Sequence, residues 1–161
     1  MCYELVILFI EDFAPYVSSL EELDHAILST ALFIFYHELG HALVDVLDLP
    51  ITGREEDAVD QLSTLVLLSA GEEGREAALT GAVWFGLRAS AATGQLPFWD
   101  EHSLDEQRFY NILCLVYGSD PESGHYLVEE GLLPQERAIR CPNEYEQMDS
   151  SWNQLLSGYL R

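Results

Sequence analysis

Phe35-Tyr36-His37-Glu38-Leu39-Gly40-His41-Ala42-Leu43 contains an H-E-x-x-H motif inside a long apolar run with helical spacing, and the rest of the chain is interpreted around it. Residues four apart on an α-helix point the same way, one turn apart along the axis, so His37 and His41 can bind one metal ion together. Glu38 is rotated by roughly 100° from His37, which keeps it off the metal but within reach of a metal-bound water. One helical turn therefore predicts two metal ligands, His37 and His41, and a catalytic general base, Glu38.

The alternative is an amphipathic helix on which two histidines fall at this spacing without binding a metal. Apolar residues predominate on both flanks of the motif, over residues 26–34 and 43–47, so the imidazoles are expected to lie in or beside a core. Buried neutral imidazoles need polar partners, and a metal ion is one. We therefore favour the metal site.

Length and composition limit the class of protein. The 161 residues suit a single domain, 1–161, with a sizeable core. No uninterrupted apolar run reaches the ~18 residues that cross a bilayer, so no membrane insertion is expected. With 28 acidic and 7 basic residues, the formal charge of -21 repels nucleic acid and anionic lipid, and neither is expected as a partner.

Hydrophobic periodicity predicts a compact, mainly α chain. The first segment favours a helix halted near Pro15, although residues 5–10 would also suit a buried strand. Ser19 and Glu22 form a capping-box pattern that starts the long motif helix, which runs to about Asp48. Further helices are expected over residues 54–70, 73–92 and 104–117 (with Ser103 as a cap), then as short segments to residue 140 and a last helix over residues 143–156.

A catalytic zinc ion usually takes three protein ligands, so two histidines need a third. The triple-histidine version of the motif is excluded, because Val44 and Leu47 stand where it requires Gly and His. The other version takes a Glu from a following helix, and residues 56–60 offer the pattern E-x-x-x-D. Glu56 would bind the metal, while Asp60 would accept the free ring N–H of a ligand histidine.

Two alternatives to this arrangement stay open. An ideal antiparallel helix pair would put Asp60 nearer the level of His41 than Glu56. Either the chain curls back after the motif helix or Asp60 is itself the ligand, and we favour Glu56. In the second alternative, residues 55–57 bind no metal and are acidic only because carboxylates interact favourably with the dipole at a helix N-terminus. This would explain residues 55–57, but not Asp60.

His102 is a further candidate for the active site. Trp99, Asp100 and Asp105 surround it in the sequence, and a zinc hydrolase needs a hydrogen-bond donor for the developing oxyanion. The alternative is a surface histidine near the start of a helix.

These motifs resemble a bacterial family classed by sequence as metallopeptidases of unknown function. The resemblance rests on residues 37–43 and 49–61, together with residues 2–5, 98–102, 107–109, 117–121, 140–141 and 144–145. It implies a zincin-like helical domain in which one Zn²⁺ is bound by His37, His41 and Glu56, with Glu38 as the base. Family members commonly carry an export signal and a further segment ahead of residues 2–5. Edge strands are therefore expected to be short or missing here, and the resemblance implies a periplasmic or secreted protein, although this chain starts without a signal peptide.

The resemblance to exported proteins also implies a disulfide bond. Of the three cysteines, Cys114 and Cys141 would pair in an oxidising compartment, and Cys2 would be left over.

The function expected from these residues is zinc-dependent hydrolysis of a peptide or protein substrate. The alternative is a non-catalytic metal-binding helical module that binds a partner through its acidic surface. Glu38 separates the two, because a structural zinc site is usually closed by four protein ligands and has no need of an unliganded carboxylate beside it.

Overall fold

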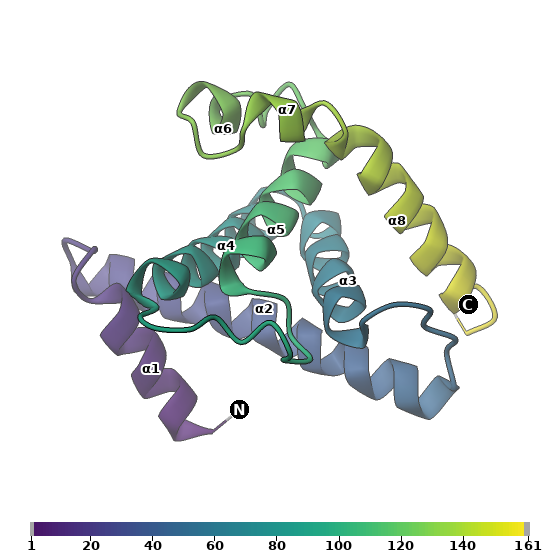
Figure 1. The fold of residues 1–161 in the computed structure, drawn as a ribbon, viewed down its shortest axis with the longest axis horizontal. Coiled ribbons are helices and arrows are strands. Elements are labelled where there is room, and N and C mark those ends of the chain that lie inside the picture. The colour runs from purple at the N-terminus through teal and green to yellow at the C-terminus, as the bar shows by residue number, and fades with distance from the viewer. Residues whose placement is uncertain (1, 160–161) are drawn as a thin grey trace.

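The computed structural model describes residues 2–159, and every regular element in that range is a helix (Figure 1). The helices, in chain order, are α1 (Tyr3–Phe13), α2 (Leu20–Leu47), α3 (Glu55–Ser69), α4 (Glu72–Ala91), α5 (Asp105–Ser119), α6 (Tyr126–Glu129), α7 (Gln135–Ala138) and α8 (Cys141–Leu156). The mainly α fold expected from the sequence is confirmed, with no strand in residues 2–159.

The N-terminal segment is a helix, so the alternative of a strand over residues 5–10 is wrong. Phe9 and Phe13 are buried, and the Phe9 ring meets the edge of Trp84 with 5.1 Å between centroids. The indole N–H of Trp84 donates a hydrogen bond of 2.8 Å to Asp12. These contacts hold α1 against α4, and α1 also packs on α2.

Both ends of α2 are fixed by local hydrogen bonds. Ser19 Oγ accepts from the Glu22 N–H at 3.1 Å, while the Glu22 carboxylate accepts from the Ser18 N–H, one residue earlier than a capping box requires. At the other end Asp48 takes a left-handed conformation, with φ 52°. The Leu49 N–H then bonds to the Val44 carbonyl at 3.0 Å, which turns the chain back along α2.

The connector over residues 48–54 therefore runs back beside α2, as Figure 1 shows, and α3 begins near the motif instead of beyond the end of α2. Residues then pair across the two helices in antiparallel order. Ser63 Oγ bonds to the Phe33 carbonyl at 2.7 Å, and Val59 lies against Gly40. The chain thus curls back after α2, as the arrangement with Glu56 as the ligand requires, while the choice between Glu56 and Asp60 stays a prediction.

Gly40 sets the distance between α2 and α3. A Cβ atom added there would lie 2.8 Å from both Cβ and Cγ1 of Val59, closer than real Cβ contacts come. Because Gly40 has no Cβ atom, the motif helix can approach α3 closely enough for side chains on the two helices to meet.

We expect Gly40→Ala to separate α2 from α3, because Val59 is fully buried and cannot move away. Overpacking of this kind lowers the free energy of unfolding by about 1–3 kcal/mol. Urea denaturation measures it, with Gly53→Ala as the control, since a Cβ at Gly53 meets nothing within 4 Å. Equal stability of the two variants would contradict the close-packing role.

The face of α2 that points away from α3 and α4 is apolar and exposed. It carries Leu28, Leu32, Phe35, Leu39 and Val46, with exposed fractions from 38% to 76%. Within residues 2–159, α2 is also the one helix whose length and composition would allow it to cross a membrane, a test that core helices pass as well. The absence of membrane insertion expected from the sequence stays a prediction.

The C-terminal helices pack on α5, which lies between α4 and α8 (Figure 1). Cys114 of α5 and Cys141 of α8 are fully buried and form a disulfide bond, the pair that the resemblance implied. Cys2 is free and exposed. The bond ties α8 to the core helix beside an ion pair of 2.7 Å between Arg137 and Glu144.

Removing the bond with the double substitution of Cys114 and Cys141 by alanine is expected to lower the free energy of unfolding by roughly 3 kcal/mol, because the loop it closes is freed in the unfolded chain. Thermal and urea unfolding measure this, and Cys2→Ala is the matched control. Peptide mapping that recovers both thiols free from exported protein would contradict the pairing.

Candidate metal centre

The two motif histidines point the same way from α2 and meet a carboxylate from α3. His37 Nε2 and His41 Nε2 lie 3.3 Å apart. The two oxygens of Glu56 lie 3.2 Å from His37 Nε2 and 3.3 Å from His41 Nε2. The structure thus brings together the three residues expected as metal ligands, each with one ligand atom within 4.8 Å of the others.

A second carboxylate faces the other nitrogen of each ring. His37 Nδ1 lies 2.8 Å from Asp60 Oδ1, the contact expected from the E-x-x-x-D pattern. His41 Nδ1 lies 2.7 Å from Glu55 Oε1. Each carboxylate favours the tautomer with its proton on Nδ1, so both Nε2 atoms present lone pairs to Glu56.

The residues present fit a metal ion. Glu56 Oε2 is shielded from solvent and accepts no hydrogen bond from the described residues, although ring nitrogens lie close to it. Lone pairs of two imidazoles and one carboxylate that face one another at this distance are unfavourable unless a cation lies between them. Two histidines and one glutamate are a donor set that catalytic zinc takes in proteins.

Asp60 is anchored from a third helix. Arg108 of α5 donates to both of its oxygens, each at 2.7 Å, and the guanidinium stacks 3.9 Å above the ring centre of Phe85. Burial alone would raise the pKa of Asp60, but the hydrogen bonds from His37 and Arg108 and their charge hold it below its usual value. Asp60 therefore stays ionised and faces the ring of His37.

We expect Asp60→Ala to weaken zinc binding by about 10- to 100-fold, as the loss of a carboxylate behind a ligand histidine does. The substitution also leaves Arg108 buried without its partner, so Asp60→Asn, which keeps the shape, serves as the second variant. Competition with a chelator at equal protein concentration measures the affinity. Unchanged affinity in both variants would show that Asp60 does not support the ligand.

Glu38 is exposed on α2, one residue from His37. Its carboxylate is near enough to act on His41 electrostatically. Partial burial lowers the pKa of His41, but the Glu55 hydrogen bond and the charges of Glu56, Glu55 and Glu38 together hold it above its usual value. An exposed carboxylate beside the cluster is open to water and to a substrate.

His102 reaches the cluster from the connector between α4 and α5, which crosses in front of α2 (Figure 1). Its Nε2 lies 3.0 Å from Glu56 Oε2, and its Nδ1 lies 3.0 Å from Asp100. Arg54 donates to the His102 carbonyl at 3.2 Å, which ties the connector to the start of α3. His102 is thus next to the proposed ligands, a position that its sequence neighbours could not establish.

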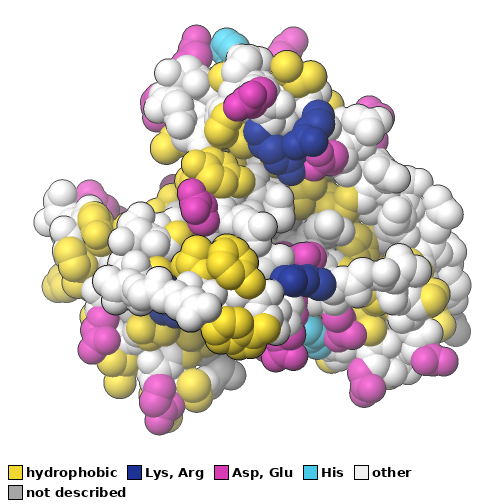
Figure 2. Space-filling model, in the orientation of Figure 1, with side chains coloured by type: hydrophobic (Ala, Val, Ile, Leu, Met, Phe, Trp, Pro, Cys, Tyr) yellow, Lys and Arg dark blue, Asp and Glu magenta, His cyan; other side chains and the backbone are white. Residues whose placement is uncertain are grey.

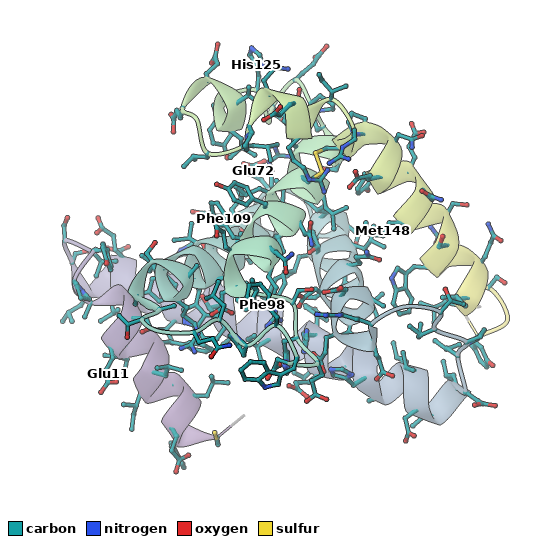
Figure 3. All side chains as sticks on the ribbon, viewed as in Figure 1. Glu11, Glu72, Phe98, Phe109, His125 and Met148 are labelled. Atoms are coloured by element: carbon teal, nitrogen blue, oxygen red, sulfur yellow. A yellow bond between two sulfur atoms is a disulfide. The ribbon has the colours of Figure 1, made fainter. Side chains whose placement is uncertain are left out.

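Ser103 does not cap α5, so that expectation is wrong. Its hydroxyl donates instead to Asp57 of α3 at 2.6 Å, and the N-cap residue is Leu104. The cross-chain bond to Asp57 holds the same connector against α3. The exposed aromatic side chains on this connector include Phe98, labelled in Figure 3, and Trp99, with exposed fractions of 69% and 76%.

The surroundings of the cluster are acidic. Figure 2 shows histidine partly covered by Asp and Glu side chains where α2 and α3 meet, with basic side-chain surface beside it. A cleft of about 720 Å³ lies between α3, α5 and α8, and its wall includes Arg54, Asp57 and Asp60. Its lining does not include His37, His41 or Glu56, so the cleft is not the proposed metal site itself.

Three residues of this site were not found as contributors from the sequence. From the sequence, Glu55 is only part of an acidic helix start. Its position next to the candidate ligand Glu56 is the one feature that could have indicated its contact with His41. Arg108 lay in a segment of the family resemblance but received no role. Asp100 is, from the sequence, only a neighbour of His102, whereas in the structure its carboxylate lies 3.0 Å from His102 Nδ1.

Comparison with known proteins gives one family match. A family model described as "Putative metallopeptidase" matches residues 1–156. No curated protein and no solved structure matched the chain. Since the family match covers nearly the whole sequence, the chain belongs to this family of putative metallopeptidases.

Proposed function

We propose that the protein is a zinc-dependent peptidase in which His37, His41 and Glu56 bind the metal. The observation that carries the proposal is the convergence of two Nε2 atoms on the carboxylate of Glu56, whose shielded Oε2 accepts no hydrogen bond from the described residues. Asp60 and Glu55 each accept the Nδ1 proton of one motif histidine, which is the usual way in which a carboxylate orients a metal-binding imidazole. Family membership supports hydrolysis of a peptide bond.

When bound, zinc would supply a Lewis acid that lowers the pKa of a water molecule to about 7 and polarises the amide carbonyl. Glu38 takes the proton from the attacking water and passes it to the leaving amine nitrogen. Asp60 and Glu55 keep the two imidazoles oriented during this transfer. The exposure of Glu38 fits this role, because its carboxylate must reach both water and substrate.

Asp60 is better suited to hold His37 than to bind the metal. Both of its oxygens accept from Arg108, and one of them also faces His37 Nδ1. A metal ion at Asp60 would have to replace these contacts in a buried position. Glu56 Oε2 accepts no hydrogen bond from the described residues, and the groups nearest to it are imidazole nitrogens that could bind the same ion, which favours Glu56 as the third ligand.

The charge of the protein favours a cationic or neutral peptide over an anionic one. The formal charge is -21, and the cluster is bordered by Glu38, Glu55 and Asp100. An acidic rim raises the local concentration of basic peptides and their association rate, and salt screens this effect. We propose a peptide or protein substrate, with no nucleic acid as a partner.

Digestion of a broad peptide library by the zinc-loaded protein tests the proposal. Mass spectrometry should find new termini that disappear when a chelator removes the metal and return when zinc is added back. Zinc-loaded protein that cleaves no peptide would contradict the peptidase proposal and would favour the non-catalytic metal-binding module.

A further inference from the structure

Three histidines around Glu56 share one arrangement. His37, His41 and His102 each have Nδ1 within 3.0 Å of a carboxylate, from Asp60, Glu55 and Asp100 respectively. Each turns Nε2 toward Glu56, at 3.2, 3.3 and 3.0 Å. A carboxylate at Nδ1 with a free Nε2 is the usual environment of a metal-ligating histidine. His102 therefore resembles the two motif histidines in the partners of its ring nitrogens, although its side chain is more exposed than theirs.

Glu56 stands between the motif pair and His102. Its Oε1 faces His41, whereas its Oε2 lies close to both His37 and His102. A second group of ligand atoms forms on the His102 side, where Glu56, Glu101 and His102 each offer one atom within 4.8 Å of the other two. Glu101 is exposed and His102 is partly buried, so this side opens to solvent.

We propose that Glu56 bridges two metal ions, the first held with His37 and His41 and the second with Glu101 and His102. One imidazole and two carboxylates are ligands for Zn²⁺ or Mn²⁺. Carboxylate bridges of this kind join ions about 3.5–4 Å apart in hydrolases with two metals. The buried Oε2 of Glu56, which accepts no hydrogen bond from the described residues, would then have a partner.

The charge at the site suits two divalent ions. The carboxylates of Glu55, Glu56, Asp60, Asp100 and Glu101 contact the three rings or belong to the two ligand groups. Two basic side chains act on this set: Arg108 pairs with Asp60, and Arg54 donates to the His102 carbonyl and attracts Asp100 through its charge. An excess of negative charge in one place is unfavourable in the free protein, and two cations remove it.

The second ion changes the role of His102. A nitrogen that binds a cation has no proton to donate, so His102 would act as a ligand and not as the oxyanion donor expected from the sequence. The connector between α4 and α5 would then be held by the metal as well as by Arg54 and Ser103. The inference shares Glu56 with the proposed function but does not require that the protein cleave peptides.

The first experiment is a count of bound metal. The full chain is loaded with zinc, freed of excess ion, and analysed by inductively coupled plasma mass spectrometry. Two zinc ions per chain are expected in the wild type, one in His102→Ala and one in Glu101→Gln. His125→Ala and Glu106→Gln are the controls, because both residues are exposed and outside the cluster, and His125 lies near α6 at the far end of the molecule (Figure 3).

The second experiment measures the separation of the ions. Electron paramagnetic resonance of the Mn²⁺-loaded wild type should show exchange coupling between two ions, and His102→Ala should show the spectrum of an isolated ion. A wild type that binds one ion, or His102→Ala and Glu101→Gln variants that both keep two, would overturn the second site. Two coupled ions without any peptide cleavage would support the second metal site and refute the peptidase proposal. Peptide cleavage by a protein that binds one ion would support the peptidase proposal and refute the second metal site.

Discussion

Glu56→Ala is expected to abolish stoichiometric zinc binding at the histidine pair. The two imidazoles alone leave the ion with two protein ligands, and Glu56 is the residue whose oxygens lie 3.2 and 3.3 Å from their Nε2 atoms. The fold should persist, because Glu56 contributes no hydrogen bond through Oε2 and the contacts between α2 and α3 at Gly40 and Ser63 remain. Metal analysis after dialysis, together with circular dichroism, measures both effects.

Glu55→Ala is the matched control for this change. It removes the adjacent carboxylate, which contacts His41 Nδ1 at 2.7 Å but is not one of the proposed ligands. The zinc affinity of this variant should fall by about 10- to 100-fold without loss of the site. If Glu56→Ala keeps zinc and Asp60→Ala loses it, Asp60 is the third ligand.

Glu38→Gln is expected to lower the hydrolysis rate by at least about 10²-fold, within the 10²- to 10⁴-fold range of general-base catalysis. Glutamine keeps the size and polarity of the side chain but cannot take a proton from water. Because Glu38 is exposed and is not among the proposed ligands, zinc content and melting temperature should change little. Turnover of one peptide by equally zinc-loaded proteins measures the difference.

Asp45→Asn provides the matched control for Glu38→Gln. Asp45 is an exposed acid on α2, two turns beyond Glu38, and the substitution removes the same charge without touching the cluster. Its turnover should equal that of the wild type. Wild-type turnover by Glu38→Gln would refute the proposed mechanism.

Local sequence was sufficient to predict the helical framework. The spacing of His37 and His41 depends only on the helix period, and Ser19 and Pro15 mark helix boundaries within one or two residues of those observed. The N-terminal segment remained ambiguous because a short apolar run suits either a buried strand or a helix. Packing of Phe9 against Trp84, far along the chain, resolves that ambiguity.

The site beyond the motif depends on contacts that no local pattern encodes. The position of Glu56 opposite both histidines requires the return of residues 48–54 along α2, which follows from the left-handed turn at Asp48. The bonds of Arg108 to Asp60 span 48 residues. The E-x-x-x-D pattern and the family resemblance both pointed to Glu56 as a candidate ligand, but the approach of His102 to it became visible only in three dimensions.

We propose that a zinc ion lies between His37, His41 and Glu56, and anomalous diffraction at the zinc edge from crystals of the zinc-loaded protein locates it. We expect an anomalous peak about 2.0–2.1 Å from Nε2 of both motif histidines and about 2.0–2.2 Å from a Glu56 oxygen. A zinc-loaded crystal in which this position has no peak, with the metal bound elsewhere on the acidic surface, would contradict it.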